Sequence, residues 1–292
     1  MDSLRWGADA SAPAPERKAV PIPAIRRMTL DDLRRALDWA AAEGWNPGLR
    51  DAEAFHAADP DGFLCSDHAC VAAIRTGEGQ GFIGLYIVRA EARGQGHGLA
   101  IWQAAMARLA GRTIGLDGVV AQQANYRRSG FRFAWNNARY ETQGAIAPGV
   151  VGETEPAALE PELVAFDAAH AGAPRPDFLR GWIGAAGHVA LVQRGPAGIE
   201  AFGVIRPCRE GSKIGPLFAM SPARADAMLR ALAAHRADGP LIIDVPEDQP
   251  HAVALARTHG MEKRFETARM YAGPPPMLLR ENIYGIASFE LG

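Results

Sequence analysis

Three alternating glycines, Gly94, Gly96 and Gly98, mark the segment of this sequence whose residue types and spacing point most directly to chemistry. Glycine lets backbone N–H groups turn towards a ligand without obstruction by a Cβ atom. A helix is expected to begin near Gly98, and the free N–H groups at a helix N-terminus favour an anion. Arg93 adds a cation that can reach a phosphate. The segment therefore predicts a cradle for a pyrophosphate.

The glycine spacing differs from that of two common phosphate-binding loops. A dinucleotide fingerprint has Gly-x-Gly-x-x-Gly, whereas the third glycine here comes one residue earlier. A P-loop requires Gly-Lys followed by Ser or Thr, which this segment lacks. The pattern Arg-x-x-Gly-x-Gly from Arg93 to Gly98 instead resembles the acetyl-coenzyme A loop of the GNAT N-acetyltransferases.

A second element strengthens this resemblance. The segment Tyr126-Arg-Arg-Ser-Gly-Phe131 is similar to the Tyr-x-x-x-Gly-Phe element of the same family and follows the glycine loop by about 30 residues. The resemblance implies that the Tyr126 hydroxyl lies near the coenzyme A sulfur and protonates the departing thiolate. A phenol with a reference pKa of about 10 is a suitable acid for a thiolate of about 8.5.

The resemblance also implies which residues bind acetyl-coenzyme A, the expected co-substrate. Backbone groups of Tyr86, Ile87 and Val88 are expected to hold the pantetheine arm like a missing strand, between strands predicted at 81–88 and 112–119. The pyrophosphate is expected to contact Arg93, Gly94, Gln95, Gly96, His97 and Gly98.

The chain departs from the family pattern at one position. Family members often carry an asparagine seven residues before the tyrosine, where this sequence has Val119. Asn125 or Gln122 is the expected substitute for that polar contact.

The sequence leaves the general base open. No acid lies on the strand predicted at 81–88, where some family members place one. Asp117, at the end of the partner strand, is expected near the acetyl group. Glu43 and Asp51 are the alternatives on loops that usually border the acceptor site, although each also suits an ordinary cap or turn, and a water chain is a further alternative. Trp45 and Asp51 are expected to contact the acceptor.

Apolar spacing predicts the elements that position these residues. A continuous apolar run predicts the strand at 81–88. Leu99, Trp102, Met106 and Leu109 then recur at helical spacing and predict one buried helix face. A strand at 112–119, a helix at about 121–129 and a strand at 131–140 complete the unit.

The chain also contains an internal repeat with an offset of 130 residues. Gly130-Phe131 followed by Ala138-Arg139-Tyr140 corresponds to Gly260-Met261 followed by Ala268-Arg269-Met270. In the second copy, residues 93–98 correspond to 223–228, which contain no glycine and carry Asp226, expected to repel a phosphate. Tyr126 corresponds to Ala256, which has no proton to donate.

The second copy is therefore expected to keep the fold and to lack both the glycine loop and the tyrosine acid. This arrangement resembles tandem GNAT proteins with a YitH-like C-terminal domain. We expect an α+β chain of two tandem GNAT folds, each a mixed, mostly antiparallel, splayed sheet flanked by helices. The predicted ranges are a flexible tail at 1–23, a catalytic domain at 24–143, a linker at 144–160 and a degenerate domain at 161–292.

Composition excludes several other classes of protein. The 31 basic and 33 acidic residues give a net charge of -2, which provides no field for nucleic acid or an anionic membrane. No run approaches 18 apolar residues and the N-terminus lacks an apolar region, so we expect a cytoplasmic protein. Cys65, Cys70 and Cys208 form no Cys-x-x-Cys pair, and we expect no metal site.

The expected activity is transfer of an acyl group from acetyl-coenzyme A to a primary amine by direct attack in a ternary complex. The amine is expected to belong to a small molecule bound between the domains. Acetylation of a protein lysine or N-terminus, and a non-catalytic module that senses acetyl-coenzyme A, are the alternatives. The sequence does not define the oligomeric state.

Overall fold

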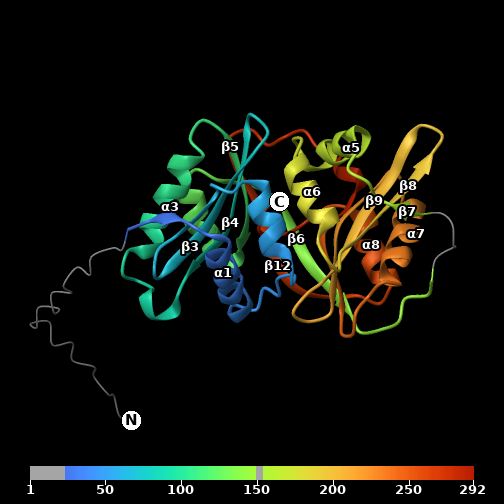
Figure 1. Cartoon of the computed structure of the whole chain (residues 1–292), viewed down its shortest axis with the longest axis horizontal. Helices are drawn as coiled ribbons and strands as arrows, with labels where there is room; N and C mark the ends of the chain where they lie inside the picture. The colour runs from blue at the N-terminus through green and yellow to red at the C-terminus, as the bar shows by residue number, and fades with distance from the viewer. Residues whose placement is uncertain (1–23, 149–153) are drawn as a thin grey trace, which may run out of the picture.

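The computed structural model describes residues 24–148 and 154–292, which form one continuous sheet of 13 strands with helices packed against it (Figure 1). The predicted tail at 1–23 and part of the predicted linker, 149–153, lie outside the described residues. The first repeat contains β1 (Arg26–Arg27), α1 (Leu30–Ala42), α2 (Asp51–Ala58), β2 (Phe63–Cys65), β3 (Ala69–Thr76), β4 (Gln80–Val88), η1 (Ala90–Ala92), α3 (His97–Arg108), β5 (Thr113–Val119), η2 (Val120–Gln122), α4 (Gln123–Arg128) and β6 (Arg132–Thr142).

The second repeat has the same order of strands and α-helices as far as β12, after which it adds η3 and β13. It contains β7 (Glu155–Pro156), α5 (Pro161–Ala171), α6 (Pro176–Gly184), β8 (Val189–Gly195), β9 (Gly198–Pro207), β10 (Ser212–Ala219), α7 (Pro222–Ala233), β11 (Leu241–Pro246), α8 (Pro250–Thr258), β12 (Glu262–Ala272), η3 (Arg280–Asn282) and β13 (Ile283–Gly285). The closing strands β6 and β12 begin 130 residues apart, so the offset found in the sequence is confirmed.

The last strand of each repeat lies in the half of the sheet that the other repeat builds. β12 pairs antiparallel with β5, β6 pairs antiparallel with β11, and β6 and β12 pair with each other at the centre of the sheet. The sequence ranges 24–143 and 161–292 therefore delimit the repeats and not two separate packing units, because each range contributes its final strand to its neighbour.

Two buried ion pairs join the exchanged strands to their new neighbours. Arg269 on β12 is the register partner of Asp117 on β5, and both its Nε and Nη2 donate to that carboxylate at 2.8 Å. Arg139 on β6 is likewise the register partner of Asp244 on β11, with Nε and Nη2 at 2.8 and 2.9 Å. The repeated Ala-Arg fragment of the sequence thus supplies the same ion pair on both sides of the exchange.

Local sequence explains where the helices of the first repeat begin. Thr29 caps α1 by accepting a hydrogen bond from the Asp32 N–H, and the Asp32 side chain accepts one from the Thr29 N–H. The predicted apolar face of α3 is wrong at one position, because Leu99 is 63% exposed. The helix instead buries Ile101 and Trp102 towards the sheet.

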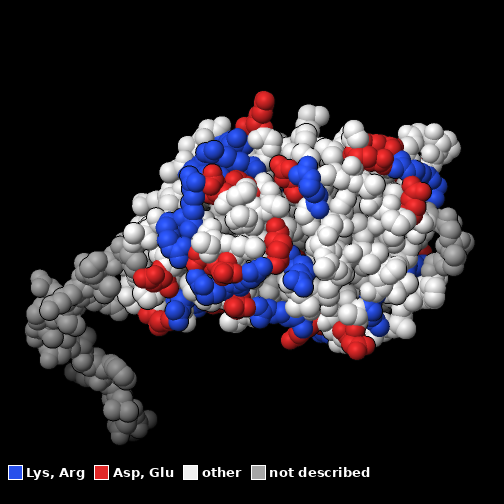
Figure 2. Space-filling model, viewed as in Figure 1, with Lys and Arg blue, Asp and Glu red and all other residues white. Residues whose placement is uncertain are grey.

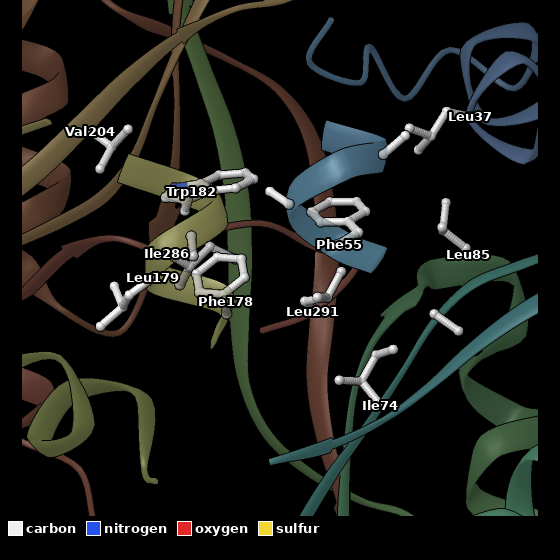
Figure 3. Close-up of a cluster of buried hydrophobic side chains, with 14 of the residues drawn as sticks. Leu37, Phe55, Ile74, Leu85, Phe178, Leu179, Trp182, Val204, Ile286 and Leu291 are labelled. Carbon is white, nitrogen blue, oxygen red and sulfur yellow. The ribbon is translucent and has the colours of Figure 1, made fainter. Parts of the chain in front are cut away.

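The main hydrophobic core extends across both repeats. Phe55 on α2 stacks on Trp182 of α6 with ring centroids 5.9 Å apart, and Phe178 stacks on the same indole (Figure 3). Leu291, near the C-terminus, lies beside Phe55 in this cluster. The two halves of the sheet therefore share one core in addition to the exchanged strands.

The charged residues lie mostly outside this core. On the face shown in Figure 2, acidic and basic side chains are intermixed and are densest over the half that carries α1 and α3. Among the helices of residues 24–148 and 154–292, none is long and apolar enough to cross a membrane.

Candidate active site

The site begins at an opening between β4 and β5. These strands pair in parallel only from Gln80–Ile83 against Thr113–Leu116 and then diverge. The register between β3 and β4 shifts after Gly84, which leaves Leu85 and Tyr86 in a bulge, and Leu85 has the left-handed φ of +46°. Beyond the bulge, the backbone of β4 on the side of β5 faces the opening rather than a ladder partner.

A cavity of about 420 Å³ fills this opening. Its walls come from both repeats, because residues of β4, β5 and the loops after α1 and β4 meet residues of β6, β12 and the C-terminal segment. The lining residues are Glu43, Trp45, Ile83, Gly84, Leu85, Tyr86, Ile87, Val88, Arg93, Leu116, Asp117, Val119, Gln122, Tyr126, Arg139, Phe265, Thr267, Phe289 and Glu290.

The glycine loop enters α3 in the conformation that its sequence predicts. Gly94 and Gly96 have φ of +75° and +91°, a region that side chains with a Cβ rarely adopt. Gly96 is the N-cap and contributes no side chain, and the first helical hydrogen bond runs from the Ala100 N–H to the Gly96 carbonyl. The N–H groups of residues 97–99 therefore point out of the helix start, as an anion cradle requires.

Arg93 connects this loop to the end of β4 and to the loop after α1. Its guanidinium is half-exposed, donates to the Val88 carbonyl at 3.0 Å and forms an ion pair with Glu43. Arg93 was predicted to contact the phosphate, and Glu43 was one of the alternatives for the base. In the structure, the charges of these two side chains neutralise each other. Glu43 is consequently a weak candidate for the base, since its charge is already compensated.

Tyr126 lies at the inner end of the same cavity. Its ring packs against Trp102 and Phe131 and lies over Gly118, where an added Cβ would come within 2.7 Å of the ring. Burial raises the pKa of Tyr126, and the nearby Tyr86 hydroxyl adds to the effect. The phenol therefore keeps its proton at neutral pH and is available as an acid.

Asp117 also lines the cavity, but its carboxylate is fully engaged. Besides the two bonds from Arg269, it accepts one from Asn137 Nδ2 at 2.7 Å, and its side chain has no exposed surface. Its counterpart Asp244 makes the same bidentate pair in the repeat that lacks the glycine loop. This shared arrangement indicates that Asp117 holds the exchanged strand, and the geometry does not favour the sequence-based expectation that it is the base.

Two other residues of the predicted site, Asp51 and Asn125, do not line the cavity. Asp51 is buried at the start of α2, where it accepts from the Gly48 N–H at 2.8 Å and from Arg206 Nε at 3.0 Å, so the geometry does not favour the expected acceptor contact at this cavity. Asn125 is exposed and donates to Gln122 at 2.7 Å, and Gln122 is the residue that lines the cavity.

Two side chains of the glycine loop also turn away from the cradle. The His97 ring is buried against His68, with centroids 4.9 Å apart, so only its backbone N–H remains for a phosphate. Gln95 donates its side-chain amide to the Glu91 carbonyl at 2.8 Å.

One part of the cavity wall is aromatic and comes from both repeats. Phe265 meets Phe289 edge to face at 6.0 Å, and the Arg139 guanidinium lies 5.2 Å from the Phe289 ring centre. Arg139 also donates to the Trp45 carbonyl at 2.7 Å, so the predicted acceptor residue Trp45 does border this region. No sequence motif identified Phe265 or Phe289 as cavity residues, because neither lies near the first-repeat motifs.

The second repeat has lost its glycine loop by deletion. Eight residues, 89–96, separate β4 from α3, whereas only Met220 and Ser221 separate β10 from α7. The expected correspondence of 93–98 with 223–228 is therefore wrong, since 223–228 lie inside α7. Asp226 does not face a phosphate site there; it binds Arg230 and His259 instead. Ser221 caps α7 by accepting from the Arg224 N–H.

Within the described ranges, no cluster of three or more His, Cys, Asp or Glu side chains is arranged to hold a metal ion. Cys65, Cys70 and Cys208 are buried as free thiols.

Comparison with known proteins agrees with this geometry. The model of an acetyltransferase (GNAT) domain family matches residues 163–285, which belong to the second repeat. The chain is 30% identical over 273 residues to holothin acyltransferase of Pseudoalteromonas sp. (strain SANK 73390), covering 90% of this chain and 92% of the relative.

Two solved structures share the fold. A proposed acetyltransferase from Pyrococcus horikoshii superimposes with a TM-score of 0.80 at 23% identity, over 95% of this chain and 98% of that one. A tandem GNAT protein from the clavulanic acid biosynthesis pathway gives a TM-score of 0.54 at 13% identity, over 86% of this chain and 99% of that one. The predicted fold of two tandem GNAT units is thereby confirmed.

Proposed function

This chain belongs to the GNAT acyltransferases, and from that premise we propose that it transfers the acetyl group of acetyl-coenzyme A to the primary amine of a small molecule. The observation that carries the proposal is that the unpaired edge of β4, the Tyr126 hydroxyl and an aromatic pocket all border one cavity, with the glycine cradle beginning at its rim.

The residues present fit the acyl donor. The backbone of Tyr86, Ile87 and Val88 is open towards β5, and buried backbone groups require a hydrogen-bonding partner such as the amides of a pantetheine arm. Gly94 and Gly96 leave the loop free of Cβ atoms, and Arg93 supplies a cation at its edge. We propose these residues as the donor site, with Gln122 in place of Asn125 as the neighbouring polar contact.

The shape of the acceptor end favours a small molecule over a protein. The aromatic pocket is bounded by residues from both repeats, including Trp45, Phe265 and Phe289, and it lies where the two halves of the sheet join. A concave site with aromatic walls and a few polar side chains suits a small ligand. The relative that is named for acylating holothin is consistent with such an acceptor, although the acceptor of this chain need not be the same compound.

In the proposed reaction, acetyl-coenzyme A supplies an activated thioester. The chain then has two tasks, which are to align the amine with the acyl carbon and to move protons. Alignment in a shared cavity contributes up to about 7–11 kcal/mol, whereas one proton-transfer group contributes about 10²–10⁴-fold in rate. Tyr126 is the proposed acid that protonates the leaving sulfur, and the amine attacks directly without a covalent enzyme intermediate.

The proposal is tested first by ligand binding and then by turnover. Acetyl-coenzyme A at 100 times its dissociation constant is expected to stabilise the native state by about 2.7 kcal/mol, which a thermal unfolding curve resolves, whereas NADH and ATP should have little effect. A panel of small aromatic amines and a lysine peptide are then compared by release of free thiol. Stabilisation by none of the ligands, or turnover of the peptide alone, would overturn the proposal.

A further inference from the structure

The segment after η3 fills, with its strand β13, an opening between β10 and β11 that corresponds to the opening between β4 and β5. β10 and β11 pair in parallel over Ser212–Ile214 and Leu241–Ile243 and then diverge at a bulge, as β4 and β5 do in the first repeat. β13 occupies the opening, because Leu217 and Phe218 of β10 pair with Gly285 and Ile283. Leu217 and Phe218 lie 130 positions after Ile87 and Val88 and so correspond to them. The strand edge that is open in the first repeat is therefore paired, in the second repeat, by the chain's own strand β13.

After β13 the same segment crosses to the first repeat. The Ile286 N–H donates to the Asp244 carbonyl at 2.9 Å, and Leu291 is buried in the shared core. Between these anchors, the backbone of Glu290 lies against Gly84 of β4 so closely that a Cβ there would come within 2.0 Å of the Glu290 carbonyl. Gly84 therefore provides the space in which Glu290 reaches the cavity.

Glu290 differs from the other two acids of the cavity. Glu43 pairs with Arg93 and Asp117 pairs with Arg269. Among the described residues, the Glu290 side chain has no hydrogen-bond or ion-pair partner, although it is only 4% exposed and lines the cavity. A buried carboxylate without a partner is costly, and such groups concentrate at functional sites.

From this placement we propose that Glu290 is the general base of the acyl transfer, delivered to β4 by the segment 283–292. This inference rests on the proposed function. The amine gives one proton to the Glu290 carboxylate and forms the bond to the acyl carbon as the carbon–sulfur bond breaks. Tyr126 gives one proton to the sulfur, so one proton is gained and one lost by the protein, and solvent restores both residues.

The electrostatic surroundings of Glu290 suit this role. Burial raises the pKa of Glu290, and Asp51 from α2 raises it further. Lys213 from β10, Arg139 from β6 and Arg206 from β9 oppose that rise, and the net shift is upward from the ordinary value of about 4.3. A carboxylate with a raised pKa accepts a proton more readily, yet it remains ionised at a pH above that pKa.

The test compares Glu290→Gln with Glu281→Gln, which makes the same chemical change at an exposed position of η3, just before the segment 283–292. Glu290→Gln is expected to lower kcat by about 10²–10⁴-fold and to remove the acid limb of the pH profile of kcat. Glu290→Asp is expected to restore part of the rate and the limb, and Glu281→Gln to leave both unchanged. Calorimetry should give the same Kd for acetyl-coenzyme A in all four proteins.

Two further measurements separate this inference from the proposed function. The infrared difference between the wild-type protein and Glu290→Gln reports the titration of this carboxyl without any turnover, and its midpoint is expected above pH 4.3, the ordinary value. If acetyl-coenzyme A binds but no amine is acylated, the proposed function fails while this titration still reports on Glu290. An unchanged acid limb in Glu290→Gln, an ordinary titration midpoint, or a loss confined to the melting temperature would each overturn the assignment.

Discussion

Replacing Asp117 by Asn distinguishes a structural carboxylate from a catalytic one. The Asp117–Arg269 pair is buried, with side-chain exposures of 0% and 8%, and its repeat counterpart Asp244–Arg139 is equally buried at 1% and 7%. Asp244→Asn therefore provides a matched control that makes the same change at the equivalent position. Because both carboxylates hold an exchanged strand, we expect the two substitutions to have the same kind of effect.

The size of the effect follows from the charge that remains. Removing one member of a buried ion pair leaves an uncompensated charge and typically costs about 3–5 kcal/mol. Burial alone would raise the pKa of Asp244, but Arg139 and Lys213 outweigh burial and lower that pKa, so this carboxylate is ionised. Replacing Asp244 by Asn therefore leaves the buried Arg139 charge uncompensated, at the same cost in folding free energy. For a chain of this size, the melting temperature should fall by roughly 6–20 °C.

The assay combines thermal unfolding with kinetics on the folded fraction. Both variants should melt earlier, and the residual activity of each should follow the amount of folded protein. The double variant Asp244→Asn/Arg139→Met should recover part of the loss, because it removes the uncompensated charge as well. If Asp117→Asn kept the wild-type melting temperature and lost its acid limb together with about 10²-fold or more in kcat, Asp117 would be the base and the reasoning from the repeat would be refuted.

Two other substitutions address the donor site. Tyr126→Phe should lower kcat by about 10²–10⁴-fold with an unchanged Kd for acetyl-coenzyme A, and a variant with full activity would exclude Tyr126 as the acid. Because burial raises the pKa of Tyr126, the wild-type rate should not fall through ionisation of this group near its ordinary pKa of about 10. Gly94→Ala and Gly111→Ala introduce a Cβ at matched left-handed positions, with φ of +75° and +81° and no atom within 4 Å. Calorimetry should show about tenfold weaker binding of acetyl-coenzyme A for Gly94→Ala only, a difference of about 1.4 kcal/mol, and equal losses in both variants would contradict the cradle.

The sequence was most informative where a function depends on neighbouring residues. The left-handed turn at Gly94 and Gly96 needs only the identity of those residues, since Cβ sterics are local. The separation of Tyr126 from the loop along the chain was likewise informative, because a strand and two helices of ordinary length connect the two. The duplication was visible because both copies kept fragments such as Ala138-Arg139 and Ala268-Arg269 at one offset.

The proposed general base and the proposed acceptor pocket depended instead on contacts between distant segments. The sequence placed Asp117 near the reaction, but its partner Arg269 is 152 residues away and arrives only through the exchange of β12. Glu290 has no motif around it, and its position follows from β13 entering the opening between β10 and β11 and from the space left by Gly84.

The sequence alone therefore predicted the left-handed glycine turn, through local backbone preference, and the repeated fold, through its repeated fragments, while the resemblance to the GNAT family supplied Tyr126 as the proposed acid. Only the tertiary structure decided which carboxylates are paired, because ion pairing and burial depend on which strands become neighbours. Strand register joins residues without regard to their separation along the chain, and in this protein it pairs Asp117 with Arg269. Glu290 lines the same cavity without such a partner among the described residues.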